Sequence, residues 1–288
     1  MARTKRTSSS DPDKGLPSGS IARALSVLSI VAESARPVSS AEIATQCSID
    51  PSTAHRLLLT LANEGYLLRE ESSKRYIASP KLLFPLPLYH PWYVVRREAA
   101  PIIHGIRDRH GFTTGFVVFA LGERVLLDLA IGKDPLSPHY QTWLDSPLHA
   151  SGSGLIYLMA STLERRRELL GPGPYHRYTE KTVTSEAALS RILDDSAERG
   201  FVTALDDYID GFSVVAAPLC PVNRETIGCF FCSGRSSNLT PDNVLEVATE
   251  LKKALKFFAL GCTALQGLAD LVSASPPRPS RAVNRIKV

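Results

Sequence analysis

The chain has 288 residues and a formal net charge of +4, with 44% hydrophobic and 22% charged residues. This length allows one large domain or two of ordinary size, and the composition is that of a soluble globular protein. No apolar run approaches the roughly eighteen residues that a membrane helix needs. Residues 1–19 also lack the apolar stretch of a secretory signal, so we expect a cytoplasmic protein with no membrane partner.

The two ends of the chain, residues 1–19 and 269–288, are rich in Ser, Pro and basic side chains. Segments of this kind bury too little apolar surface to fold, so we expect a disordered basic arm and a disordered basic tail. Basic arms can attract DNA phosphates without regard to sequence. A purely solubilising role fits the same composition equally well.

Residues 20–79 begin with the pattern of two helices. Ser20–Glu33 carries apolar residues at helical spacing. Further on, Ser39 and Glu42 form a capping-box pattern, in which each side chain bonds the backbone amide of the other residue. A short second helix is therefore expected to follow Ser39.

A third helix is predicted from Pro51 to about Asn63. Asp50 suits the N-cap, Pro51 the first helical position, and Gly65 the position just past the end. Polar side chains on its outer face gather near the N-terminal half, where a recognition helix carries the groups that reach base edges or phosphates. The inward stripe is expected to consist of Ala54, Leu57, Leu58 and Leu61.

Two short strands, Tyr66–Arg69 and Arg75–Ile77, are expected around a polar turn. Three helices followed by a hairpin with a basic tip are typical of a winged helix-turn-helix. The alternative is a small helical domain whose outer faces are polar only for solubility. We predict that the residues contacting DNA are Ser40, Ser52, Thr53, His55, Arg56, Thr60, Lys74 and Arg75.

Motifs along most of the chain point to a known family. The N-terminal motifs are Ile21–Leu28, Ser40–Ala44, Pro51–Leu58 and Leu61–Tyr66, and the later ones are Leu148–Gly154, Arg199–Phe201, Gly211–Pro218, Ser233–Gly234 and Leu239–Thr240. These motifs resemble those of the isocitrate-lyase-regulator (IclR) family of bacterial transcription factors, over about residues 20–265.

The resemblance implies a winged helix-turn-helix joined by a linker helix to a GAF-like effector-binding domain. We accordingly expect a DNA-binding domain at 20–79, a linker at 80–95 and an effector domain at 96–268. The family binds DNA as dimers or pairs of dimers. The expected partners are therefore a second copy of the chain, a pseudo-palindromic operator, and a small effector that changes the affinity for that operator.

The linker region departs from the family pattern. It contains Pro80, Pro85, Pro87 and Pro91, and interior prolines break helices. One straight helix over 80–95 is therefore not expected. A helix that begins near Pro91 and runs towards Arg109, with a kink at Pro101, fits the sequence better.

The C-terminal part has the pattern of an α+β domain with an antiparallel sheet flanked by helices. The predicted strands are Thr113–Ala120, Arg124–Ile131, Phe201–Leu205, Ser213–Leu219 and Thr226–Ser233. One helix is expected through Leu155 and Met159, a second at Ser185–Glu198, and a long last one from Thr240-Pro241 through Cys262.

The five cysteines are Cys47, Cys220, Cys229, Cys232 and Cys262. An odd, scattered set favours buried thiols in a reducing compartment over a disulfide framework. Cys229 and Cys232 have the spacing of a metal or redox motif, but positions three apart in a strand point to opposite faces. We therefore expect core packing there, and neither a metal nor another cofactor.

The effector site is expected between the loop at 149–154, whose free amides could face an anion, and a wall of strand residues. Family members that bind small oxoacids line this pocket with an acidic residue, a cysteine and two strand serines. In this sequence the acidic, cysteine and first serine positions correspond to Ala204, Val214 and Phe231, and the position usually taken by lysine corresponds to Leu155. These changes predict an effector larger and more apolar than glyoxylate or pyruvate. The predicted effector-binding residues are His149, Ser151, Gly152, Ser153, Gly154, Leu155, Asp207, Val214, Phe231 and Ser233. The alternative is that the loop is simply a closely packed helix start.

An enzyme is the rival class, because Ser151 and Ser153 lie near His149 in the sequence. A nucleophile elbow needs G-x-S-x-G after a strand, and Ser153 has Ser151 and Leu155 where those glycines belong. No H-E-x-x-H, P-loop or G-x-G-x-x-G motif is present in the sequence. We therefore expect a regulator without catalytic activity, and a Ser/His-dependent hydrolase is the disfavoured alternative.

Overall fold

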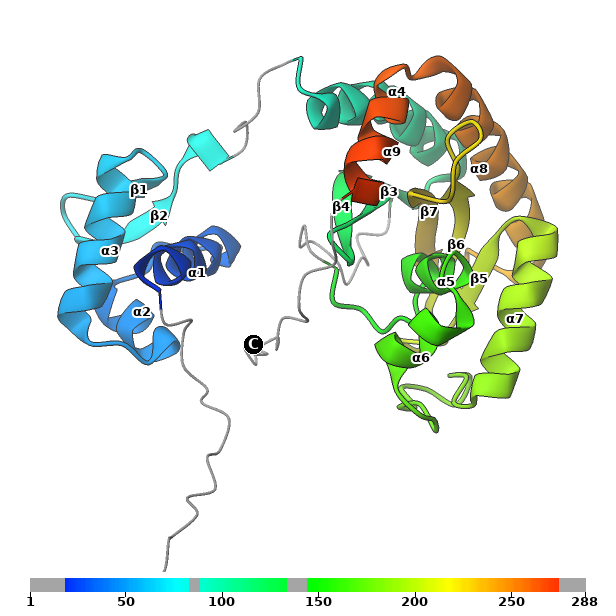
Figure 1. The fold of residues 1–288 in the computed structure, drawn as a ribbon, viewed down its shortest axis with the longest axis horizontal. Helices are drawn as coiled ribbons and strands as arrows, with labels where there is room; N and C mark the ends of the chain where they lie inside the picture. The colour runs from blue at the N-terminus through cyan, green and yellow to red at the C-terminus, as the bar shows by residue number, and fades with distance from the viewer. Residues whose placement is uncertain (1–18, 83–88, 134–143, 275–288) are drawn as a thin grey trace, which may run out of the picture. The chain divides into compact units, whose positions relative to one another are not determined.

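The structure is a computed structural model that describes residues 19–82, 89–133 and 144–274. The chain divides into two compact units, one up to Pro87 and one from Leu88 (Figure 1). Among the described residues, no helix is long and apolar enough to cross a membrane. The predicted basic arm lies almost entirely outside the described residues, as does the linker between 83 and 88.

The N-terminal unit has three helices and a two-stranded hairpin, as the sequence predicts. Its elements are α1 (Ser20–Glu33), α2 (Ser40–Cys47), α3 (Pro51–Asn63), β1 (Leu67–Arg69) and β2 (Tyr76–Ala78), and a short 3-10 helix, η1 (Pro80–Leu82), follows the hairpin. The capping box between Ser39 and Glu42 is present, and the Asp50 side chain caps α3. Leu58 and Ile43 are fully buried in the single apolar core of the unit. Val38 bridges to Tyr76 and so joins the start of α2 to the hairpin.

The C-terminal unit is built on a five-stranded antiparallel sheet in the order β4-β3-β7-β6-β5. The strands are β3 (Thr113–Ala120), β4 (Glu123–Ala130), β5 (Val202–Leu205), β6 (Phe212–Leu219) and β7 (Gly228–Arg235). The helices are α4 (Pro91–His110), α5 (Gly152–Met159), α6 (Leu163–Leu170), α7 (Glu186–Arg199), α8 (Pro241–Gly261) and α9 (Ala264–Ala274). Both the predicted α+β class and the sheet are confirmed.

The sheet separates two apolar layers (Figure 1). Helices α4, α8 and α9 pack on one face, and α5 and α7 on the other. Cys232 belongs to the first layer and Cys229 to the second, and both thiols are fully buried. Strand alternation therefore accounts for this cysteine pair as core residues, and burial raises the pKa of each thiol to about 12.

The structure corrects the boundaries of the predicted tail and linker. The last helix continues to Ala274, so residues 269–274 are not a disordered tail. Leu268 and Ala269 are buried against the α4 layer, which gives this segment the apolar contacts that its composition alone did not reveal. Helix α4 begins at Pro91, as predicted, and its Val95 lies in the core of the C-terminal unit rather than in a linker.

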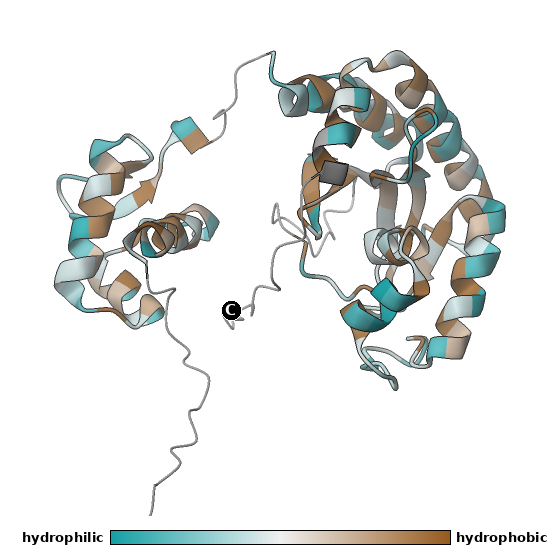
Figure 2. Cartoon of the chain, in the orientation of Figure 1, coloured by the Kyte–Doolittle hydropathy of each residue, from teal (hydrophilic) through white to brown (hydrophobic). Residues whose placement is uncertain are grey.

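Helix α6 was not predicted. It has no buried residue, and its sequence is hydrophilic along most of its length (Figure 2). No apolar stripe therefore marked it in the sequence. The only local signal is Thr162, whose side chain caps the helix by accepting a hydrogen bond from the amide of Arg165.

Candidate DNA and effector sites

The outer face of α3 carries most of the predicted DNA contacts. The Asp50 carboxylate accepts hydrogen bonds from the Thr53 amide at 2.9 Å and the Ser52 hydroxyl at 2.6 Å, and these bonds lower its pKa. The first turn of α3 is thus held in place by its cap. His55 and Arg56 are exposed, and within the described residues neither side chain has a hydrogen-bonding or ionic partner.

Most of the other side chains predicted to contact DNA already have partners within the protein. The Thr60 hydroxyl donates to the Arg56 carbonyl at 2.9 Å, and Lys74 pairs with Glu71 at 2.9 Å. Arg75 is only half-exposed, and its guanidinium donates to the Glu42 carboxylate and the Pro37 carbonyl, both at 3.0 Å. Arg75 therefore ties the hairpin to the start of α2, a contact that sequence reasoning missed. Ser40, the first residue of α2, is partly buried.

Glu42 links the elements of the N-terminal unit. Its carboxylate accepts from the Ser39 amide at 2.7 Å, and its own amide donates to the Ser39 hydroxyl at 3.2 Å. Hydrogen bonds from Ser39 and Arg36, with the nearby charge of Arg75, lower the pKa of Glu42 to about 2. The carboxylate stays ionised at any physiological pH and holds the helix start and the hairpin in register.

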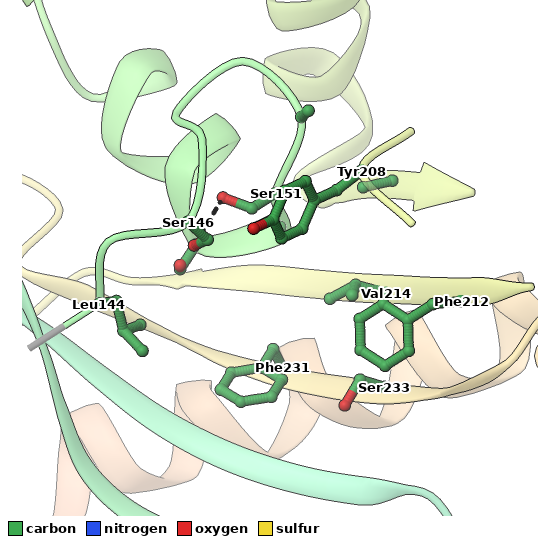
Figure 3. Close-up of a pocket in the computed structure, with 12 residues that line it drawn as sticks. Leu144, Ser146, Ser151, Tyr208, Phe212, Val214, Phe231 and Ser233 are labelled. Carbon is green, nitrogen blue, oxygen red and sulfur yellow. Dashed lines mark hydrogen bonds between the residues drawn. The ribbon is translucent and has the colours of Figure 1, made fainter. Parts of the chain in front are cut away.

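A pocket lies between the N-terminal loop of α5 and strands β6 and β7 (Figure 3). Of the ten predicted effector residues, six line it: Ser151, Gly152, Ser153, Val214, Phe231 and Ser233. Ala204, where the family's acidic pocket position falls, also lines it. Sequence reasoning missed five lining residues: Leu144, Ser146, Ala150, Tyr208 and Phe212. Val214 and Phe231 give the side formed by the strands an apolar surface, and Ser146 and Ser151 face it from the loop before α5 (Figure 3).

Two glycines bring the α5 loop close to its neighbours. A Cβ atom on Gly152 would lie 2.6 Å from the Val214 side chain, so only glycine lets the helix start rest on β6. A Cβ on Gly154 would lie 2.5 Å from the Leu148 carbonyl oxygen. Gly154 thus packs against its own loop and does not line the pocket.

The other predicted effector residues also lie outside the pocket lining. His149 Nε2 forms a hydrogen bond with the His176 carbonyl oxygen at 2.9 Å, and its ring packs beside Tyr175 and Tyr178. Leu155 is buried in the core layer. His149 therefore orients the loop that follows α6 and makes no hydrogen bond to Ser151 or Ser153.

Ser233 is the least satisfied polar group of the pocket. It is 1% exposed, and its hydroxyl has no hydrogen-bond partner within the described residues. It lies on β7 beside Val214 and Phe212, below the serine loop (Figure 3). Burying a hydroxyl without a partner is unfavourable, so this position is suited to a hydrogen bond from a bound molecule.

Asp206 and Asp207 follow β5 at the edge of the site, and their pKa values are shifted in opposite directions. Burial raises the pKa of Asp206, but bonds from Lys181 at 2.7 Å, Ser236 and the Gly211 amide outweigh it and lower the net pKa. Burial is the dominant effect on Asp207, whose pKa it raises to about 6. The Asp207 carboxylate therefore destabilises the folded protein once it ionises.

Asp207→Asn is expected to stabilise the C-terminal unit at pH 7.5 by about 1–2 kcal/mol, a range reduced for solvent screening. Because the folded-state pKa is raised, wild-type stability falls as pH rises through about 6. The gain should disappear below pH 4, where the wild-type carboxyl is protonated. Asp206→Asn is the matched control and should lower stability at pH 7.5. Thermal unfolding from pH 4 to 8 checks both, and a pH-independent gain for Asp207→Asn would contradict the assignment.

Comparison with known proteins agrees with this architecture. The sequence matches the IclR helix-turn-helix domain over residues 20–71 and the bacterial transcriptional regulator IclR C-terminal domain over residues 94–256. The transcriptional repressor IclR of Escherichia coli K12 is 25% identical over 239 residues, which cover 82% of this chain and 87% of the repressor. The glycerol operon regulatory protein of Streptomyces griseus is 27% identical over 248 residues, covering 82% and 92% of the two chains.

Solved structures share the fold. An IclR homolog from Microbacterium hydrocarbonoxydans, complexed with 4-hydroxybenzoate, has a TM-score of 0.74 at 22% identity and covers 86% of this chain and 100% of its own. An IclR regulator from Alicyclobacillus acidocaldarius has a TM-score of 0.71 at 22% identity, with 84% and 97% coverage.

A winged helix-turn-helix followed by a sheet domain with a pocket, together with the two family matches, defines a DNA-binding transcriptional regulator with an effector-binding domain. The match to the C-terminal domain alone spans more than half of the chain. The chain belongs to the IclR family of transcriptional regulators.

Proposed function

We propose that the regulator reads a pseudo-palindromic operator with the exposed face of α3, and that a small effector in the C-terminal pocket changes its affinity for this operator. The observation that carries the DNA-reading role is the pair His55 and Arg56. Both side chains are exposed, and among the residues that the structure describes neither has a partner. They lie on a helix whose first turn is fixed by Asp50. Side chains in this position reach base edges in helix-turn-helix complexes.

The proposed DNA contacts divide by the kind of group that they reach. Base edges or nearby phosphates are contacted from α3 by Ser52, Thr53, His55, Arg56 and Thr60, and phosphates are contacted by Ser40, Lys74 and Arg75. Because Arg75 is held by Glu42, its role is to fix the hairpin against the start of α2 as well as to contact the DNA phosphates.

Arg56→Ala is expected to weaken specific operator binding by about 1–3 kcal/mol, because a base-reading arginine contributes that much. The measurement is an anisotropy titration with the intergenic DNA upstream of the gene, at two salt concentrations and with competitor DNA. Arg191→Ala removes the same charge from an exposed position of α7 in the other unit and serves as the matched control. Equal affinities for the wild type and Arg56→Ala would remove Arg56 from the reading set.

We propose that two copies pair through their N-terminal units. Ile21 and Leu25 lie one turn apart on α1 and are 76% and 58% exposed. Exposed apolar side chains at this spacing form a stripe that a second copy of the helix can cover. Sedimentation of the full chain at micromolar concentration tests this pairing, and a monomer in that assay would contradict it.

The effector is proposed to have an apolar, preferably aromatic, body. Phe212, Val214 and Phe231 supply the apolar wall that supports this proposal, and the structurally similar Microbacterium protein is bound to 4-hydroxybenzoate. We infer no catalytic activity, since His149 is bonded to the His176 carbonyl and not to a serine. A thermal-shift screen of aromatic acids, phenols and small oxoacids tests the effector class. Binding of small oxoacids alone would contradict it.

A further inference from the structure

Arg124, at the start of β4, is a buried cation beside the pocket. It is only 4% exposed. One guanidinium nitrogen donates to the hydroxyls of Ser146 at 3.1 Å, Ser151 at 3.0 Å and Ser153 at 3.0 Å. Another donates to the carbonyl oxygens of Leu144 at 3.4 Å and Ser146. Ser146, Ser151 and Ser153 form the polar side of the pocket.

Within the part of the chain that the structure describes, the charge of Arg124 has no partner of opposite sign. All the acceptors of its hydrogen bonds there are uncharged, and neither Glu123 nor Asp145, whose charges raise its pKa, forms an ion pair with it. Burial lowers the pKa of Arg124 only to about 10, so it remains a cation at neutral pH. Buried charges in proteins are normally paired, because removing an ion from water is costly.

The serine hydroxyls carry the effect of this charge to the pocket. Because their oxygens accept from the guanidinium, their protons must point elsewhere. The Ser146 proton goes to Ser151 at 3.2 Å and the Ser151 proton to the Pro147 carbonyl at 2.6 Å. Within the described residues the Ser153 proton has no acceptor. Ser153 can therefore donate into the pocket, with a positive charge directly behind it.

We propose that this end of the pocket binds the negatively charged group of the effector, with Arg124 as the residue that compensates its charge through Ser146, Ser151 and Ser153. The ligand class is an organic anion with an aromatic or apolar body. The body lies on Phe231 and Val214, and its acidic group faces the serine loop (Figure 3). This inference rests on the proposed effector function and adds the charge of the ligand to it.

The test compares ligands of equal shape and different charge. The affinity of the full chain for 4-hydroxybenzoate and for 4-hydroxybenzamide, and for benzoate and benzamide, is measured by calorimetry. The wild type is expected to prefer each anion at least about tenfold, as one charge-assisted hydrogen bond gives. Arg124→Gln should remove most of this preference, Arg124→Lys should keep part of it, and Arg191→Gln, at an exposed site, should leave it unchanged.

A merely structural role for Arg124 gives a different result. Loss of loop geometry would weaken the anion and the amide by the same factor, so an unchanged ratio in folded Arg124→Gln overturns the proposal. Should Arg124 variants not fold, Ser153→Ala must lower the anion preference for the proposal to stand. Equal wild-type binding of acid and amide overturns this inference and leaves the proposed aromatic effector intact. If neither member of either pair binds while operator binding is normal, the proposed effector class fails and the inference falls with it.

Discussion

Leu58→Ala is expected to abolish operator binding by unfolding the N-terminal unit while the C-terminal unit keeps its fold. Leu58 lies on the inner face of α3 and is fully buried among Ile43, Val31 and Leu67. Removing such a side chain leaves a cavity and costs about 2–5 kcal/mol. So small a unit has little stability to lose, because a short chain buries only a modest share of its surface.

The neighbouring residue provides the control for this substitution. Leu59 is 36% exposed on the same helix, whereas Leu58 is fully buried, so Leu59→Ala makes the same chemical change with a smaller loss of burial. Calorimetry of the full chain should show the N-terminal transition lost or shifted strongly down for Leu58→Ala and shifted clearly less for Leu59→Ala. Binding of an aromatic ligand reports the C-terminal unit. Unimpaired operator binding by Leu58→Ala would show that the α3 core is not needed to present the reading face.

Helix starts could be predicted from the sequence because their caps are local. Ser39 with Glu42, and Asp50 with Pro51, each place an N-terminus by bonds that span only a few residues. The first and last residues of the strands were predicted nearly as well, because β3 and β7 are apolar runs flanked by turns. Elements without an apolar face of their own, such as α6, leave no such pattern.

The effector pocket was only half predictable, and Arg124 shows why. In the sequence it follows a turn at the edge of a hairpin, where an arginine is ordinarily exposed. Its burial is created by a segment that is distant in the chain, because the Leu144 amide bonds the Arg124 carbonyl at 2.9 Å and the serines cover the guanidinium. His149 and Leu155, which are close in sequence to the pocket residues, were predicted to bind the effector, but both lie outside the pocket lining. Residues adjacent in a loop and a first helical turn point in different directions, so neighbours in sequence need not share a site.

Gly154→Ala is expected to destabilise the C-terminal unit by about 1–3 kcal/mol and to abolish effector binding, as overpacking of a tight site does. The added Cβ would lie 2.5 Å from the Leu148 carbonyl oxygen and 2.7 Å from the Ser151 hydroxyl. Backbone cannot move aside as a flexible side chain can, so the loop itself must shift. That shift would take Ser151 away from Arg124, to which it is bonded at 3.0 Å.

Gly261→Ala tests whether it is the contact, and not the loss of a glycine, that matters. Nothing lies within 4 Å of a Cβ at Gly261, the last residue of α8. An alanine there should be neutral or stabilise by up to about 1 kcal/mol, because glycine disfavours helix. Thermal unfolding with and without 4-hydroxybenzoate compares the two variants. If Gly154→Ala kept both its melting temperature and its ligand shift, the loop would be free to adjust, and the close packing of the α5 start could not be what fixes the serines in the pocket.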